Sequence, residues 1–237
     1  MKLPLHVPHL MIVLSDINIE VLSGTQEATD IGRQLVQGCR EVGFAYFRNT
    51  GIHQAEVESV FEWSKKLFSL PIETKMLALH PKESWKHQGY TNVCCPRLQR
   101  LHYNWLPEQV LPGFRDAASA FFDTCHRFKL QKLLPALRNI HREGENRMRL
   151  LHYPSVPAES KMNRINAHMD FGTCAMLFQD DVGGLEVEIL NGSGNFVPAP
   201  PIPGTVVFNI GDLLMRWSNG TLKSTLHRIR APPNDET

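Results

Sequence analysis

Apolar residues recur at helical spacing through the first part of the chain. Within residues 31–42 they fall on one face, which predicts an amphipathic helix ended by Gly43. Similar stripes, rich in phenylalanine, run through residues 57–68 and 110–133. Stripes of this kind form protein core more often than binding surface. The pattern therefore predicts a mostly helical region over residues 1–146.

From residue 147 onward, short apolar runs alternate with turn residues. Each run has the length of a β-strand, and the segments between the runs are rich in Gly, Asn, Asp and Pro. Short strands at this spacing are typical of a sandwich, jelly roll or barrel. We predict an α+β fold in which helices pack against a mainly β core over residues 147–237, in one compact unit. The predicted strands are residues 149–153, 174–178, 185–189, 205–210 and 222–229.

The composition is that of a globular protein without a polyanionic partner. Hydrophobic residues make up 42% of the 237 residues and charged residues 21%, which excludes a disordered chain. Lys and Arg total 25 against 24 for Asp and Glu, and no basic run carries interleaved aromatic residues. We therefore expect no nucleic-acid partner. A monomer is the default expectation.

Two features of the sequence concern where the protein works. The five cysteines contain no CxxC pair, which favours free thiols in a reducing compartment, and we predict a cytoplasmic location. The apolar run at residues 10–14 is shorter than the core of a signal peptide and far shorter than a membrane span. We therefore expect no membrane partner.

A metal-binding pattern lies within the predicted β region. His168 and Asp170 are two positions apart, so in a strand both side chains would point to the same face. His227 lies in the last predicted strand. Two histidines and one carboxylate suit non-haem Fe(II) and leave three coordination positions open. A zinc site would use similar residues in tetrahedral geometry, so the three ligands alone do not distinguish iron from zinc.

Four blocks of the sequence resemble a known enzyme family. Two of them are HMDFGTCAMLFQDDVGGLEV, starting at His168, and PGTVVFNIGDLLMRWSNGTLKSTLHRI, starting at Pro203. The blocks EVGFAYFRNTGI (41–52) and RLLHYP (149–154) precede them in the family's order. Together they are similar to the isopenicillin N synthase-like branch of the Fe(II)/2-oxoglutarate-dependent dioxygenases. The likeness covers most of the chain.

The resemblance implies a fold and a metal site. The implied fold is a double-stranded β-helix, or jelly roll, with N-terminal helices packed on one side and a first strand near residues 44–49. The resemblance also implies that iron is bound by His168, Asp170 and His227. A protein of this kind holds three ligands in place and leaves the rest of the chemistry to the metal and its cosubstrate.

The resemblance further implies an activity and a pocket. The activity is that of a non-haem Fe(II)/2-oxoglutarate-dependent dioxygenase, an oxidoreductase that uses dioxygen to hydroxylate, desaturate or cyclise a small organic molecule in specialised metabolism. Tyr153 and Arg149 would line the cosubstrate or substrate pocket. Phe171, Leu177 and Trp217 would be either pocket walls or core residues.

The sequence also departs from the family pattern. The family carries an Arg-x-Ser pair on the strand after the distal histidine, where the Arg binds the far carboxylate of 2-oxoglutarate. Here the chain continues RIRAPPNDET after His227, without that pair. Arg228 and Arg230 are too close to His227 to be the family's Arg, and Arg230 would act as a displaced substitute. The stretches at 94–102 and after residue 140 are also shorter than in the family, so we expect a shortened chain.

Two alternatives to an active dioxygenase stay open at this point. One is a catalytically impaired or silent dioxygenase-like protein, which keeps the metal ligands but lacks the Arg-x-Ser that anchors 2-oxoglutarate. The other is a jelly-roll metalloenzyme with zinc or another ion, such as an isomerase or hydrolase. This second alternative fits the three ligands but not the longer family blocks.

Overall fold

The computed structural model of the chain divides into two compact units. One unit joins Met1–Thr50 to Ser155–Thr237, and the other is Gly51–Pro154. This division differs from the predicted boundary at residue 146, because the strand at residues 44–48 is hydrogen-bonded to a strand of the C-terminal part. The structure describes residues 17–18, 26–79, 81, 89–90, 97–99, 105–133, 141, 146–153, 163–189 and 192–230.

Three stretches discussed above fall outside these residues. They are residues 10–14, residues 231–237 and all of 94–102 except 97–99. Among the helices that the structure describes, none is long and apolar enough to cross a bilayer.

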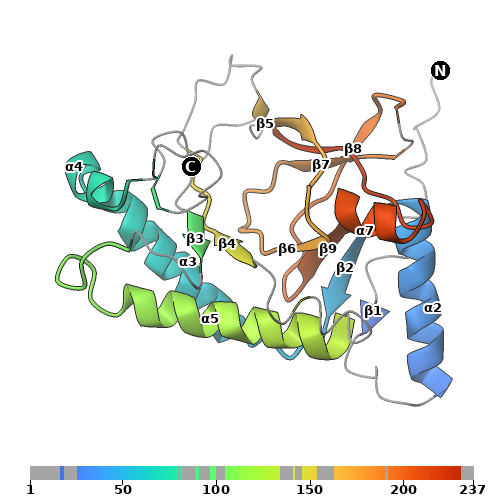
Figure 1. Cartoon of the computed structure of the whole chain (residues 1–237), viewed down its shortest axis with the longest axis horizontal. Coiled ribbons are helices and arrows are strands. Elements are labelled where there is room, and N and C mark those ends of the chain that lie inside the picture. The colour runs from blue at the N-terminus through green and yellow to red at the C-terminus, as the bar shows by residue number, and fades with distance from the viewer. Residues whose placement is uncertain are drawn as a thin grey trace. The chain divides into compact units, whose positions relative to one another are not determined.

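The first unit contains two four-stranded sheets (Figure 1). The first sheet runs β1 (Ile17–Asn18), β2 (Phe44–Arg48), β9 (Val206–Ile210), β6 (Cys174–Leu177). The second sheet runs β5 (Asn163–His168), β10 (His227–Arg230), β7 (Leu185–Glu188), β8 (Phe196–Pro198). Within both sheets every strand pair is antiparallel except β1 with β2. Two antiparallel sheets around a shared core form the predicted jelly roll.

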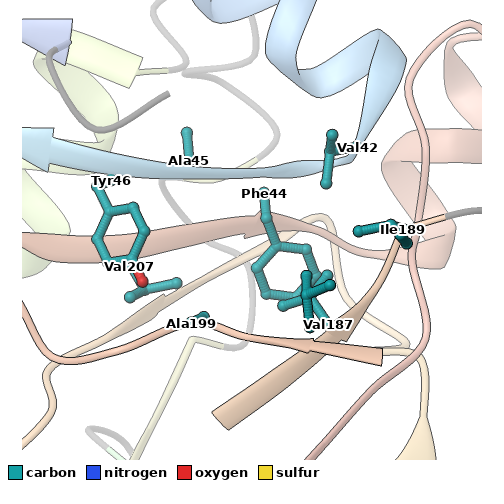
Figure 2. A pocket seen from close by; sticks show the side chains of 9 residues that line it. Val42, Phe44, Ala45, Tyr46, Val187, Ile189, Ala199 and Val207 are labelled. Atoms are coloured by element: carbon teal, nitrogen blue, oxygen red, sulfur yellow. The ribbon is translucent and has the colours of Figure 1, made fainter. Parts of the chain in front are cut away.

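Apolar side chains from both sheets form the core of this unit. Phe44 and Tyr46 of β2 pack with Val207 of β9 against Leu185 and Val187 of β7. These side chains meet because residues two positions apart in a strand point to the same face. An apolar cavity remains inside this core, between β2 and β9 on one side and β7 and β8 on the other (Figure 2).

Helix α2 (Gln26–Glu41) confirms the helix predicted over residues 31–42. The chain turns after it through Gly43, whose φ of 79° lies in the left-handed region and whose N–H donates to the Gly38 carbonyl. A Cβ atom at Gly43 would lie 2.1 Å from the carbonyl oxygen of Lys223, so only glycine fits there. This turn leads the chain directly from α2 into β2.

Some elements differ from the prediction. Helix α7 (Asp212–Trp217) follows β9, and its 6 residues are too few to show a helical period in the sequence. The strand predicted over residues 222–229 begins only at His227, as β10. The strand predicted over residues 149–153 is β4 (Arg147–Arg149), which ends where the prediction begins.

The second unit is mostly helical. Helices α3 (Gln54–Ser69) and α5 (Phe114–Phe128) pack against each other and confirm the two phenylalanine-rich stripes. Their core is formed by Leu67, Phe114 and Ala118 together with other buried apolar residues. The remaining described elements are α4 (Ile72–Lys75), the 3-10 turn η3 (Met76–Ala78), the π-helical turn η4 (Lys129–Leu133), and β3 (Arg97–Gln99) paired with β4.

Candidate metal centre

The structure brings the three predicted ligands together at one end of the second sheet. His168 is the last residue of β5 and His227 the first of β10, and the two are paired across the strands. Asp170 lies in the turn that follows β5. One ligand atom from each residue lies within 4.8 Å of the other two. In the part of the chain that the structure describes, this is the sole cluster of its kind.

Each imidazole presents the same nitrogen to the centre of the site. The Nδ1 atom of His168 lies 2.8 Å from the Asn166 carbonyl, and that of His227 lies 3.1 Å from the Thr225 carbonyl. A carbonyl only accepts hydrogen bonds, so Nδ1 carries the proton in both rings. The Nε2 atoms are thereby left with free lone pairs, which is the form that binds a metal ion.

Burial keeps one of these rings neutral. Burial lowers the pKa of His227 below its ordinary value, and the nearby His168 acts in the same direction. The Thr225 carbonyl and the Asp170 carboxylate act in the opposite direction. A neutral imidazole needs no deprotonation before it binds a metal ion, so the site is prepared for a cation at neutral pH.

The site is open on one side. The side chain of His227 is only 11% exposed, whereas those of His168 and Asp170 are 39% and 32% exposed. Phe44 covers the buried ring from the interior, with its ring centroid 5.2 Å from that of His227. A small molecule would therefore approach from the side of His168 and Asp170.

Sequence reasoning missed one residue of the site. The Asn209 side-chain amide donates a hydrogen bond of 2.8 Å to Oδ2 of Asp170. Asn209 lies on β9 and is 4% exposed. The sequence offers one signal for Asn209, which is the single amide in the otherwise apolar run VVFNI. A polar residue in a buried strand indicates a hydrogen-bond partner, because buried polar groups are almost always paired.

The structure does not bring Arg230 to the ligands. Arg230 and Arg228 both contact Glu186, through N–O distances of 3.8 and 2.7 Å respectively. Arg228 is paired with Glu186 of β7, so alternation puts both side chains on the face opposite to His227, and Arg230 contacts the same carboxylate. Arg230 thus contacts Glu186, and its role as a substitute for the family's Arg stays a prediction.

The other predicted pocket residues have different surroundings. Arg149 and Tyr153 belong to the unit Gly51–Pro154, where Arg149 is exposed and Tyr153 half-buried, and their pocket role stays a prediction. Leu177 packs against the apolar core of the first unit. Phe171 and Trp217 are 91% and 46% exposed, so neither is a core residue.

Comparison with known proteins gives matches along most of the chain. Residues 144–237 match the 2OG-Fe(II) oxygenase superfamily. Residues 14–100 match the N-terminal region described as "non-haem dioxygenase in morphine synthesis N-terminal".

Curated relatives and solved structures agree with these matches. The 2-oxoglutarate-Fe(II) type oxidoreductase ppzD of Metarhizium rileyi is 34% identical over 84% of this chain and 69% of its own length. The proline hydroxylase buaE of Petromyces alliaceus is 32% identical over 88% of this chain and 76% of its own. A full-length Neurospora crassa protein, crystallised in complex with alpha-KG and 5-formyluracil, has a TM-score of 0.81 and 33% identity, covering 91% of this chain and 76% of that one.

Proposed function

The chain belongs to the 2OG-Fe(II) oxygenase superfamily, and on this premise we propose that His168, Asp170 and His227 hold Fe(II) for the oxidation of a small organic molecule. The observation that carries the proposal is the convergence of one ligand atom from each residue within 4.8 Å. The donor set fits the ion, since two imidazole nitrogens and one carboxylate oxygen are the ligands of non-haem Fe(II) oxygenases.

The protein's own contribution is to position the ligands. The carbonyls of Asn166 and Thr225 fix the proton on Nδ1 of each histidine, so that both Nε2 atoms face the metal position. When bound, Fe(II) with 2-oxoglutarate as cosubstrate supplies the activation of dioxygen and the oxidation of the substrate. The buried side of the site keeps water away from His227, while the exposed side admits the reactants.

The substrate class rests on the relatives. One relative is named a proline hydroxylase, and the Neurospora structure holds 5-formyluracil, a pyrimidine. We place this chain in the same chemical range, as an enzyme of specialised metabolism. A cytoplasmic location fits the cysteines in the part of the chain that the structure describes, since Cys39, Cys125 and Cys174 form no disulfide bond.

The decisive experiment is anaerobic addition of Fe(II) and 2-oxoglutarate to the purified protein. We expect the charge-transfer absorption of an Fe(II)–2-oxoglutarate complex, and slow formation of succinate once air is admitted. His168→Ala and Asp170→Ala should abolish both signals. Asp116→Ala, which removes an exposed carboxylate of α5, should leave them unchanged.

Two results would contradict the proposal. Absence of the absorption band and of 2-oxoglutarate binding in the wild-type protein would favour the catalytically silent alternative. A band that persists in His227→Ala would show that the distal ligand is a different residue.

A further inference from the structure

The two carboxylate oxygens of Asp170 have different surroundings. Oδ1 faces the two histidines, 3.8 Å from Nε2 of His168 and 4.0 Å from Nε2 of His227. Oδ2 accepts the hydrogen bond of 2.8 Å from the Asn209 amide. The oxygen that would bind a metal ion is thus distinct from the oxygen that the protein holds.

We propose that Asn209 is a positioning residue that makes Asp170 a one-oxygen ligand, by holding Oδ2 so that only Oδ1 reaches the metal. The proposal rests on the assignment of this cluster as the Fe(II) site. A carboxylate that is free to rotate can bind a metal ion through both oxygens. An amide donor on Oδ2 opposes that rotation, because rotation would break a hydrogen bond to a charged acceptor.

The position of Asn209 is itself fixed. β9 is a central strand, and Asn209 is paired with Phe44 of β2 on one side and Ala175 of β6 on the other. Its side chain points to the same face as Val207, into the interior between the two sheets. The amide is nearly fully buried, so it would be left without a partner if the carboxylate turned away.

The main chain beside the carboxylate is held by the segment that follows Asn209. The N–H groups of Gly211, Asp212 and Leu213 donate to the carbonyls of Thr173, Asp170 and Gly172, at 2.9, 2.7 and 3.1 Å. A Cβ atom at position 211 would lie 2.2 Å from the Gly172 oxygen, so only glycine permits this approach. The end of β9 and the start of α7 therefore fix both the backbone and the carboxylate of Asp170.

The arrangement has a consequence for coordination. Three single-atom ligands leave three positions of an octahedral ion open, which is the number that the two oxygens of 2-oxoglutarate and dioxygen together require. A second oxygen from Asp170 would occupy one of these positions. Asn209 thus keeps the second oxygen of Asp170 from occupying a coordination position that the reaction needs, and it also orients the carboxylate.

The test uses Co(II) as an air-stable probe of the site. Asn209→Leu keeps the branched shape of the side chain but enlarges it, Asn209→Ala shortens it to a methyl group, and both delete the donor. We expect both variants to bind Co(II) roughly 10- to 100-fold more weakly than the wild-type protein in calorimetric titration. The Co(II) visible absorption should also change in shape, because the coordination of the carboxylate changes. One variant enlarges the side chain and the other shortens it. A loss of Co(II) affinity that both share is therefore caused by removal of the amide.

The matched control is Phe208→Leu. Phe208 neighbours Asn209 on β9 but points to the opposite face, where it stacks on Phe47 with ring centroids 4.8 Å apart. This variant should lower the melting temperature without altering Co(II) affinity or spectrum. Thermal unfolding of all variants without metal shows which of them are folded.

Each outcome decides the matter. Wild-type affinity and spectrum in either Asn209 variant would overturn the proposal, and so would an equal loss in Phe208→Leu. The proposed activity would be refuted if the wild-type protein bound Co(II), lost that binding in His168→Ala, and yet formed no succinate with Fe(II). In that case the Asn209 variants would still decide the role of Asn209. Wild-type protein that binds no Co(II) would overturn both.

Discussion

Phe44 and His227 meet edge to face, with ring centroids 5.2 Å apart and ring planes inclined by 67°. Phe44 comes from β2, near the start of the described residues, and His227 from the last strand that the structure describes. The contact supports a predicted iron ligand from the interior of the jelly roll. An aromatic ring in this geometry contributes more than the area it buries.

Removal of this ring should affect both stability and metal binding. Phe44→Ala should lower the free energy of unfolding by about 3–5 kcal/mol, because the residue is 7% exposed, and weaken Co(II) binding because His227 gains freedom. Phe47→Ala is the control, since Phe47 is fully buried on the opposite face of the same strand. Phe47→Ala should lower the free energy of unfolding by a similar amount to Phe44→Ala but leave the Co(II) affinity unchanged. Equal loss of affinity in both variants would contradict the prediction.

The close approach at Gly211 predicts a strong effect of a single methyl group. Gly211→Ala should weaken Co(II) binding and lower the melting temperature, because its Cβ would overlap the Gly172 carbonyl oxygen. Gly32→Ala, in the middle of α2, meets no atom within 4 Å and should instead stabilise the protein by about 0.5–1 kcal/mol. Thermal unfolding and calorimetric titration measure the two effects. If Gly211→Ala left both the Co(II) affinity and the melting temperature unchanged, the backbone at the start of α7 would be free to move away from Gly172.

The apolar cavity offers a stabilising substitution. Ala199, which lines the cavity beside β8, is 3% exposed and its N–H donates to the Leu185 carbonyl. Ala199→Val adds two methyl groups toward the empty space and should raise the free energy of unfolding by about 0.5–2 kcal/mol. Urea unfolding measures the change. A decrease would show that the cavity is too narrow for the added carbon atoms.

His141 predicts a pH dependence of stability in the second unit. Burial lowers its pKa below the ordinary value of 6.5, and Lys129 and His126 add to this. Between the lowered value and 6.5 the folded protein binds fewer protons than the unfolded chain. The free energy of unfolding should therefore fall as the pH decreases through this window. His141→Leu should reduce the change of the free energy of unfolding with pH, which urea unfolding at several pH values measures. If this change were the same in the variant, other groups would cause the pH dependence.

Much of the jelly roll follows from local pattern. The runs at 174–178, 185–189 and 205–210 correspond to β6, β7 and β9 within one or two residues, because each apolar run is bounded by turn residues. The run at 222–229 is harder to interpret. Ser224 and Thr225 are buried there but do not belong to a strand. Thr225 is held instead by a hydrogen bond from its hydroxyl to the Val42 carbonyl.

The candidate site divides in the same way. The spacing of His168 and Asp170 alone is a weak signal, and the three ligands could be predicted because the sequence blocks around them resemble the family. Asn209 stands out in the sequence only as a polar residue in an apolar run, and its partner could not be predicted because it lies 39 residues away. The contact of Arg230 with Glu186 likewise could not be predicted, because Glu186 belongs to β7 and only the fold places it beside Arg230.

The pairing of β2 with β9 also governs how the protein is made. The registers Phe44↔Asn209 and Phe47↔Val206 cannot form until most of the polypeptide has left the ribosome. Until then the edge of β2 that pairs with β9 is open, and an apolar strand with an open edge is prone to aggregate. Slow synthesis at reduced temperature, or chaperone co-production, should therefore raise the soluble yield in a heterologous host.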